Sequence, residues 1–439
     1  MPTRRKAPRA WSNWAGTEHV QPEAVAHPVT TSDIVEAVRD AARRGRRVKA
    51  VGSGHSFTGV AVTDGVQLLL DRHRRLIDID RERGLVTVEA GMKLHRLSQM
   101  LAGWGLALAN LGDIAVQTVA GAVATGTHGT GAALGGLASQ IRGMELVLAD
   151  GSVLRCSAAE EPEVFTAARV SLGALGIMSQ VTLQAVPAFN LRAVEAVEPL
   201  DRVLEGMYDD AASNDHFEFY AVPHTGMVRT KRNNRTGEPP GGRGRAGELR
   251  DRVLLENVAF GALCRIGRRV PALVPRLARV SALETRVEYV ERSYKVFASP
   301  RWVRFVELEY ELPAAEVRAA LTEVLAAIDE RGFRISFPIE VRFTAADDIP
   351  LSTASDRESG YIAVHQYRGV DYQAYFAAVE RIMVAHGGRP HWGKMHTQDA
   401  AGLAPRYPHW DEFIAQRDRL DPEGRFANPY LDRVLGPVT

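Results

Sequence analysis

The segment QTVAGAVATGTHGTGAALGGLASQ at residues 117–140 constrains the fold more than any other part of the sequence. Six of these residues are glycine, and alanine and threonine make up most of the rest. Because glycine destabilises the interior of helices and strands, we expect neither a stable helix nor an ordinary packed sheet here. A second glycine turn, VGSGHSF, follows a strand-like stretch at 47–51, and a third, SLGALG, lies at 171–176.

Glycine turns of this kind are typical of anion-binding loops. Their backbone N–H groups form concave sites that hold phosphate oxygens without a charged side chain. Three such turns indicate an extended ligand with several anionic or polar points, as a dinucleotide has. The sequence contains neither a Walker A motif nor a G-x-G-x-x-G that opens a helix after the first strand. A Rossmann nicotinamide domain is therefore disfavoured.

Changes of pattern divide the chain into four segments. After an N-terminal segment at 1–24, residues 25–190 mix helices and strands without a repeating strand–helix–strand unit, and we expect them to form the first domain. Residues 191–410 alternate helices and strands, which is typical of an antiparallel sheet with helices on one face. Residues 411–439 form a short tail. Within the second region, residues 229–248 are rich in Gly, Pro and Arg and are expected to form a mobile loop.

The composition, 45% hydrophobic and 24% charged residues, is that of an ordinary globular protein. A formal net charge of +1 gives no overall field for nucleic acid or an anionic membrane. No window approaches the roughly 18 apolar residues of a membrane span, and the basic N-terminus lacks the apolar stretch of a secretory signal. We therefore expect a cytoplasmic protein. Cys156 and Cys264 lack metal-ligand spacing and are expected to be reduced thiols.

Five motifs, taken together and in this order, resemble one family. They are VGSGHSFTGVAVTDG, QTVAGAVATGTHGTG, SLGALGIMSQVTL, PIEVRF and RPHWGK. The chain resembles the FAD-linked oxidases of the vanillyl-alcohol-oxidase type, in the branch of the L-gulono-1,4-lactone and D-arabinono-1,4-lactone oxidases, with alditol oxidases as relatives. The similarity extends from WSNWAG near residue 11 to NPY at 428–430.

The resemblance implies an α+β, two-domain FAD-binding fold of the vanillyl-alcohol-oxidase (PCMH) type with an antiparallel-sheet cap domain. The N-terminal half and the C-terminal tail would form the FAD domain, and the cap would cover the flavin and form the substrate pocket. Cofactor contacts carried over from the family fall on the three glycine turns and on a few further positions. These are Gly52, Ser53, Gly54 and Ser56 at the pyrophosphate; Gly121, Ala122, Thr125, Thr127, His128 and Gly131 on the other side of the cofactor; Ile177 and Val181 near the adenine; and Gly112, Asp113 and Asn428.

His55 occupies the position of the family histidine that is often bonded through a ring nitrogen to the flavin 8α-methyl group. The resemblance therefore predicts covalently attached FAD, and neutral imidazole is a competent nucleophile near pH 7. The alternative is a histidine that only forms hydrogen bonds within its loop. The same alternative, a structural loop histidine, applies to His128.

Alcohol oxidation by a flavin requires help in removing the hydroxyl proton and positive charge near the flavin ring. PIEVRF places Glu340 and Arg342 two residues apart, on one face of a strand. In the resembling alditol oxidases this pair and the lysine of HWGK, here Lys394, face the substrate. We assign substrate hydroxyl binding or deprotonation to Glu340, stabilisation of the developing oxyanion to Arg342, and charge neutralisation to Lys394. Spacing alone would leave Glu340 and Arg342 as a solvated charge pair.

His365 stands where alditol oxidases carry a threonine, which favours the lactone branch. It is expected to act as a second acid or base or to donate a hydrogen bond to a lactone oxygen. In the family that the chain resembles, a glycine at the position of Gly112 accompanies access of oxygen to the flavin. The resemblance therefore favours an oxidase that gives hydrogen peroxide.

The expected partners are a small sugar lactone or polyol and O2 or another redox acceptor. Three alternatives stay open: a lactone dehydrogenase using a cytochrome or quinone, an alditol oxidase, and a non-catalytic flavin-binding protein. A metal site at His391 and His396 is disfavoured because no carboxylate or cysteine accompanies them at ligand spacing.

Overall fold

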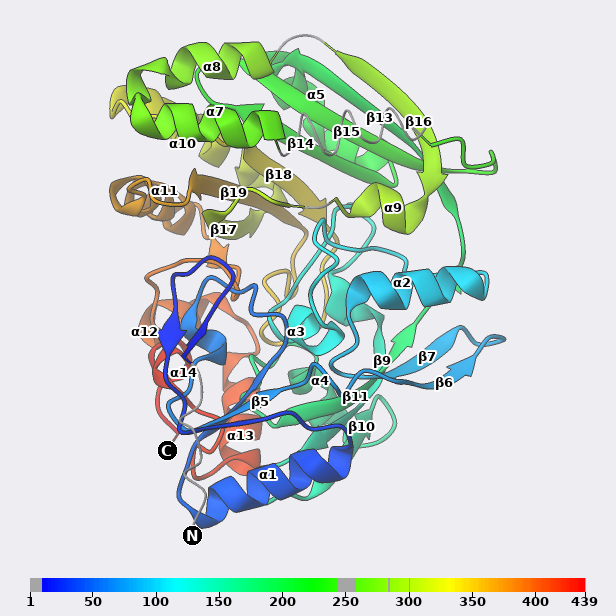
Figure 1. Ribbon diagram of the computed structural model, residues 1–439. Coiled ribbons are helices and arrows are strands. Elements are labelled where there is room, and N and C mark those ends of the chain that lie inside the picture. Colours follow the sequence, from blue (N-terminus) through cyan, green and yellow to red (C-terminus); the bar gives the residue numbers. More distant parts are fainter. Residues whose placement is uncertain (1–9, 243–257, 283–284, 300, 439) are drawn as a thin grey trace.

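The computed structural model describes residues 10–242, 258–282, 285–299 and 301–438, and it consists of two stacked parts (Figure 1). The lower part contains both chain ends and the two main sheets of the N-terminal half. The upper part is built on one large sheet and corresponds to the expected cap. Among the helices of the described ranges, none combines the length and the apolar character needed to cross a bilayer.

The lower part contains a three-stranded parallel sheet and a five-stranded antiparallel sheet. The parallel sheet has the order β3 (Ala24–Ala26), β5 (Val66–Leu69), β4 (Val48–Val51). The antiparallel sheet has the order β10 (Val153–Ser157), β9 (Ile141–Val147), β11 (Ile177–Gln184), β7 (Leu85–Glu89), β6 (Leu76–Asp80). Two short pairs add β1 (Trp11–Ser12) with β2 (His19–Val20), and β8 (Leu106–Ala107) with β12 (Val186–Pro187).

Four helices of the N-terminal half and three of the C-terminal region, from residue 400 on, complete the lower part. They are α1 (Thr31–Arg43), α2 (Leu94–Gly103), α3 (Val119–Ala124), α4 (Pro162–Ala168), α12 (Ala400–Leu403), α13 (Trp410–Leu420) and α14 (Pro429–Leu435). Helix α1 has a polar outer side and a buried apolar side. A capping box between Thr30 and Asp33 begins it, and Ile34, Val38 and Ala41 are buried.

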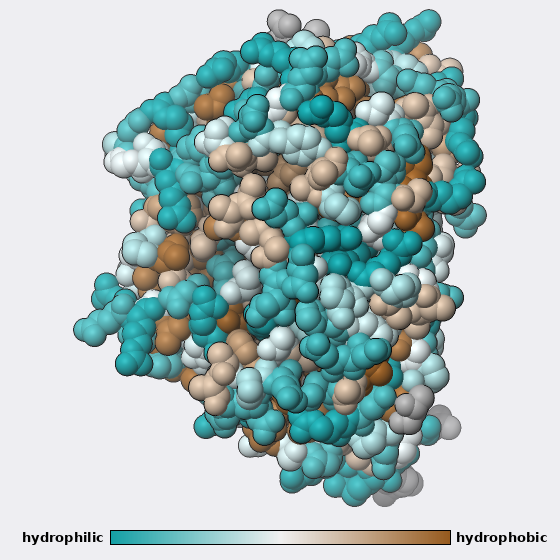
Figure 2. Space-filling view, turned by 180° about the vertical axis from the view of Figure 1, so that it is seen from behind, coloured by the Kyte–Doolittle hydropathy of each residue, from teal (hydrophilic) through white to brown (hydrophobic). Residues whose placement is uncertain are grey.

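The cap is an eight-stranded sheet in which every pair is antiparallel. Its order is β16 (Arg286–Arg292), β13 (Asn190–Pro199), β15 (Met227–Thr236), β14 (His216–Val222), β18 (Ile339–Thr344), β19 (Ser359–Tyr367), β17 (Phe305–Pro313), β20 (Arg389–Pro390). The cap helices are α5 (Leu200–Ser213), α7 (Phe260–Arg269), α8 (Val274–Ser281), α9 (Ser293–Phe297), α10 (Val317–Glu330) and α11 (Gln373–Ala385). Figure 2 shows the back of the molecule, where hydrophilic residues predominate and hydrophobic ones lie scattered between them.

Each part has its own hydrophobic core, and the chain passes between them more than once. Strand β13 begins the cap sheet at Asn190, next to the expected boundary. The C-terminal region packs again in the lower core, and Trp392, Leu403 and Tyr407 already belong to it. The return to the lower part therefore starts within the 191–410 segment.

Two expectations about local structure are wrong. The glycine-rich segment does contain a helix, α3, because Thr118 caps it and Val119, Ala122 and Val123 are buried. The basic segment 229–248 is not a loop throughout, because β15 extends to Thr236 and pairs with β13 on one side and β14 on the other. Residues 243–248 of that segment lie outside the described ranges.

Candidate active site

The face of the cap sheet that looks toward the lower part carries a cluster of polar side chains. All six residues of the central strand β18 are buried, and alternate side chains point to opposite faces. Ile339, Val341 and Phe343 enter the cap core. Glu340 and Arg342 lie on the other face, where cross-strand register places Tyr220 opposite Glu340 and Glu218 opposite Arg342 on β14.

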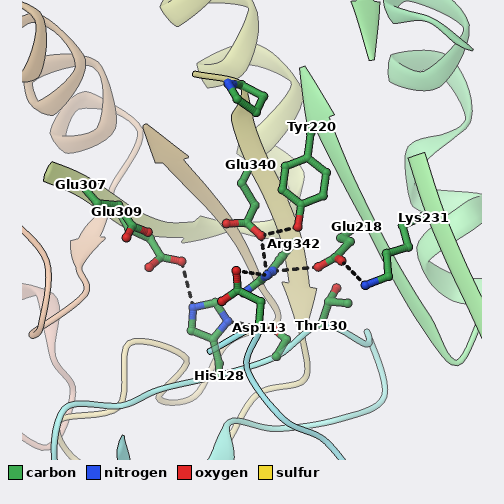
Figure 3. A network of polar contacts seen from close by, with 12 residues as sticks. Asp113, His128, Thr130, Glu218, Tyr220, Lys231, Glu307, Glu309, Glu340 and Arg342 are labelled. Carbon is green, nitrogen blue, oxygen red and sulfur yellow. Dashed lines mark hydrogen bonds and ion pairs between the residues drawn. The ribbon is translucent and has the colours of Figure 1, made fainter. Parts of the chain in front are cut away.

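Arg342 is held by three carboxylates that come from distant parts of the chain (Figure 3). Its Nε donates to Glu218 Oε2 at 2.9 Å, and its guanidinium also pairs with Glu340. Asp113, from the loop before the glycine-rich segment, lies 3.8 Å away. Tyr220 donates its hydroxyl to Glu340 Oε1 at 2.9 Å. The predicted pair is therefore a buried pair in a network, and not a solvated surface pair.

Two further cations balance this group of carboxylates. Lys231 Nζ lies 3.2 Å from Glu218, and Arg301 donates to Asp113 at 2.7 Å. Burial alone would raise the pKa of Glu218, but Lys231 and Arg342 outweigh it and hold that pKa below its usual value. The pKa of Asp113 is likewise held well below its usual value, because Arg342 and Arg301 outweigh its burial.

Glu340 differs from its two neighbours in its electrostatics. Burial raises its pKa; Arg342 opposes this shift, but the charges of Asp113 and Glu218 reinforce it. Among the three carboxylates around Arg342, Glu340 is thus the one with the greatest tendency to take up a proton. A raised pKa moves a carboxylate toward the range in which it works as a general base near neutral pH.

Lys394 and His365 join this network through β17. Lys394 pairs with Glu307, and its Nζ lies 3.5 Å from Glu309. Burial would lower the pKa of Lys394, but these two carboxylates raise it above its usual value, so the amine stays charged. His365 Nε2 lies 3.5 Å from Glu307. The ligand atoms of Glu307, Glu340 and His365 lie within 4.8 Å of one another, which connects the Lys394 group to the Arg342 group.

His128 extends the cluster into the lower part of the molecule. Its Nε2 lies 3.0 Å from Glu309 (Figure 3). Its ring stacks on Tyr361 with centroids 3.6 Å apart. His391 completes a second group with His128 and Glu309. His391 Nδ1 accepts the N–H of Gly393, which leaves the proton of the neutral ring on Nε2. Because Nε2 must lose that proton to bind a metal ion, this group is a poor metal site.

A cavity in the lower part opens between the three glycine turns. Its lining includes eight of the predicted cofactor residues, which are Gly52, Ser53, Gly54, His55, Ser56, Gly121, Thr125 and Ile177. It also includes residues that sequence reasoning missed, such as Trp11, Lys49, Gln117, Thr118 and Ser171. None of its lining residues is acidic.

The cavity walls suit a nucleotide pyrophosphate. A Cβ added at Gly52 would collide with Thr118 Oγ1, and Gly54 adopts φ +66°, which favours glycine. Bare backbone therefore faces the cavity at this turn, and the absence of carboxylates in its lining favours an anionic ligand. The residues present thus fit FAD.

The other predicted cofactor residues lie outside the cavity lining. Val181 and Ala122 are fully buried in the lower core. Asn428 begins α14 and donates to the carbonyls of Gly59 and Val62, so it ties the tail to the loop that follows the VGSGHSF turn. Gly131 donates its N–H to Phe343 O at 2.8 Å, which fastens the glycine-rich segment to β18.

Three more of these residues lie around the polar cluster. Thr127 accepts a hydrogen bond from Gln117, which lines the cavity. Gly112 and Asp113 belong to the loop below Arg342, and a Cβ added at Gly112 would meet His128 O at 3.1 Å and Thr127 Cγ2 at 3.2 Å.

His55 lies between the cavity and the polar cluster. It lines the cavity, and its ring stacks on Trp14 at a centroid distance of 5.3 Å. Burial lowers its pKa to about 4, and the nearby charges of Lys394 and Lys93 add to this shift. His55 is therefore neutral at physiological pH.

Comparison with known proteins identifies the family of this chain. The D-arabinono-1,4-lactone oxidase family matches residues 181–434, and an FAD-binding domain matches residues 22–157. The chain belongs to the D-arabinono-1,4-lactone oxidase family. The predicted aldonolactone branch is confirmed. This member of the family is an FAD-dependent oxidoreductase.

Two relatives of this family member cover nearly its whole length. An L-gulono-1,4-lactone dehydrogenase from Mycobacterium tuberculosis is 46% identical, covering 97% of this chain and 99% of its own. An L-gulonolactone oxidase from Scyliorhinus torazame is 35% identical, with 97% and 98% covered. A cholesterol oxidase structure from Brevibacterium sterolicum has a TM-score of 0.83 at 17% identity and covers 97% of this chain and 96% of its own. That likeness, with the FAD-binding domain, confirms the predicted fold class.

Proposed function

We propose that this enzyme oxidises an aldono-1,4-lactone at the hydroxyl-bearing C2 and passes the electrons to O2, giving hydrogen peroxide. The observation that carries the proposal is the convergence of Glu340, Arg342 and Lys394 on the cap face, with His55 between them and the FAD cavity. Relatives that span almost the whole chain are named for activity on L-gulonolactone. The substrate class comes from that similarity, and the roles below come from the contacts of this chain.

Glu340 is the proposed acceptor of the substrate hydroxyl proton. Its raised pKa favours proton uptake, and Tyr220 fixes the orientation of its carboxylate. Bound FAD supplies the acceptor for the hydride that leaves the same carbon. A hydroxyl that gives up its proton as the hydride departs develops negative charge in the transition state.

Arg342 and Lys394 are the proposed source of positive charge for that oxygen and for the flavin ring. Glu218 accepts from Arg342 Nε and fixes the guanidinium plane. Glu307 and Glu309 keep Lys394 charged in spite of its burial. Charges fixed before the reaction need no reorganisation during it, which is the main advantage of such sites over water.

His365 is proposed to orient the substrate. Phe305 and Phe337 pack against its ring, with centroids 5.1 Å and 5.8 Å away, and Glu307 lies 3.5 Å from Nε2. Nδ1 lies 3.3 Å from the carbonyl oxygen of Pro338, which fixes the ring further. Nε2, on the side of Glu307, is the nitrogen proposed to reach a lactone oxygen. A screen that compares turnover of polyols with turnover of lactones tests the alditol oxidase alternative.

The covalent bond from His55 to the flavin 8α-methyl group remains part of the proposal. A neutral ring with a low pKa has a free lone pair for bond formation. The new N–C bond would replace an imidazole N–H and a methyl C–H. Two protons would be lost, and the electron pair would be taken up by the flavin ring and then removed by O2. A cytoplasmic location also stays a prediction from the sequence.

One experiment tests the function. Purified yellow protein is mixed with L-gulono-, L-galactono- and D-arabinono-1,4-lactone in the absence of oxygen, and loss of the oxidised flavin absorbance identifies the substrate. Oxygen or oxidised cytochrome c is then admitted, and the faster reoxidation separates the oxidase from the dehydrogenase alternative. A protein that takes up FAD but is bleached by none of the lactones would contradict the proposal.

A further inference from the structure

Helices α7 and α8 form the end of the cap farthest from the chain termini (Figure 1). Residues 258–282 contain five arginines and no Asp or Glu. All five are exposed, namely Arg265, Arg268, Arg269, Arg276 and Arg279. Within the described residues none of them forms an ion pair. This segment therefore carries a local charge that the overall value of +1 conceals.

Apolar side chains are exposed beside these arginines. Val258, Ile266, Val270 and Val280 have exposed fractions of 48%, 43%, 46% and 64%. They are four of the nine large hydrophobic residues that are exposed in the described part of the chain, so such residues gather here. We call the exposed surface of residues 258–280, which these five arginines and four apolar side chains form, the α7–α8 face.

The opposite side of α7 faces the cap core. Gly261, Cys264 and Gly267 are buried, and Phe260 packs edge-on against Phe337 at 4.8 Å. This core lies on the side of the cap sheet away from Glu340. A partner on the α7–α8 face would therefore bind on the other side of the cap sheet from Glu340 and would not contact the polar cluster.

We propose that the α7–α8 face docks on the surface of an anionic lipid bilayer. Helices that lie in the plane of a membrane combine arginine or lysine with exposed apolar residues, and both kinds of side chain contribute to binding. Arginine extends its charged end to the headgroups while its stem covers apolar surface. The docking is peripheral, which agrees with the lack of a membrane-spanning helix among the described residues.

Charge and composition favour a bilayer over other occupants. A second copy of the chain would bring five more arginines against the first five, and no carboxylate of residues 258–282 would offset them. A nucleic acid or an acidic protein would match the arginines but would leave the exposed valines and the isoleucine in water or against polar groups. The interfacial region of an anionic membrane accommodates both the arginines and the apolar side chains.

The test is flotation of the full-length holoenzyme with vesicles of phosphatidylcholine alone and with added phosphatidylglycerol. We expect binding only to the anionic vesicles, and weaker binding as salt is raised. In the variant Arg265→Gln/Arg269→Gln/Arg276→Gln the partition coefficient should fall on the order of 100-fold, because each basic residue near such a surface contributes roughly five-fold. Val280→Cys, labelled with a polarity-sensitive dye, should brighten on these vesicles.

The matched control is Arg72→Gln/Arg74→Gln/Arg96→Gln, which removes the same charge from exposed positions of the lower part. It should float with the anionic vesicles like the unaltered protein. Thermal unfolding and turnover with a soluble acceptor should be unchanged in both triple variants, which separates lost docking from lost folding. Failure of the unaltered protein to bind, equal loss in the control, dimerisation through this face, or binding to heparin but not to vesicles would each overturn the proposal.

Discussion

Arg342 Nε donates to Glu218 Oε2 at 2.9 Å, although the two residues are 124 positions apart in the sequence. They face each other across the register of β14 and β18, and both are almost fully buried. Lys231, on the next strand, lies on the other side of Glu218. Glu218 therefore fixes the position of the guanidinium, and it needs no contact with substrate to do so.

Replacing Glu218 with glutamine should reduce both activity and stability. Removing one charge of a buried pair costs about 3–5 kcal/mol, because Arg342 and Lys231 lose their compensation. A guanidinium that is less well placed should lower kcat/KM on the order of 10- to 100-fold. Steady-state kinetics and denaturant unfolding measure the two effects. Glu198→Gln, which breaks an ion pair with Arg232 elsewhere in the same sheet, should leave kcat/KM unchanged.

Glu340→Gln tests the general base. The substitution keeps the shape of the side chain and removes its ability to accept a proton, so kcat should fall by about 10²- to 10⁴-fold. Flavin content should stay normal, since Glu340 does not line the FAD cavity. In the unaltered enzyme the rate should fall as the pH is lowered through a pKa above the usual glutamate value, because burial raises the pKa of Glu340.

The control for this variant is Glu311→Gln. Glu311 is buried in the same sheet but pairs with Arg357, so its loss should affect stability more than turnover. Equal kcat values for Glu340→Gln and the unaltered enzyme would show that Glu340 does not accept the substrate proton.

The proposed catalytic charges of Glu340, Arg342 and Lys394 were expected from the sequence and its family resemblance, but the groups that hold them were not. Glu340 and Arg342 share a face because strand side chains alternate, and this needs no tertiary information. Glu218 and Glu307 reach them only through strand pairing, which a single sequence does not give. One signal was available: VELEYEL in β17 alternates carboxylates with apolar residues, which indicates a sheet with one polar face.

The local errors have a common cause. Segments rich in glycine or arginine predict loops, but tertiary contacts determine whether such a segment forms a helix or a strand. Helix α3 forms because Thr118 accepts the N–H of Gly121 and the helix is buried. Strand β15 tolerates Arg232 because Glu198 and Asp210 pair with it. Intrinsic propensity is a weak guide where such partners are present.

His55→Asn should abolish covalent attachment of FAD. After precipitation with acid the unaltered protein should give a yellow pellet, and the variant should release its flavin into the supernatant. His95→Asn, at an exposed position of α2, should behave like the unaltered protein. A colourless pellet from the unaltered, FAD-loaded protein would show that His55 only forms contacts in its loop.

Lys49 should make the stability of the protein depend on pH. It is buried beside the FAD cavity, where its Nζ donates to the carbonyls of Leu172 and Phe426 at 3.3 Å and 3.0 Å. Burial lowers its pKa to about 7, although Asp421 and Asp432 oppose the shift. Between about pH 7 and pH 10 the unfolded chain thus binds a proton that the folded chain has lost.

The direction of the pH dependence follows from this difference in bound protons between the folded and the unfolded chain. The free energy of unfolding should rise as the pH increases from about 7 to 10, with a contribution from Lys49 of up to about 1.4 kcal/mol per pH unit. In Lys49→Met the two carbonyls lose a donor at every pH, which shifts the whole curve downward, but the contribution to the slope disappears. Urea unfolding at several pH values measures both curves. Parallel curves would show that Lys49 keeps an ordinary pKa in the folded protein.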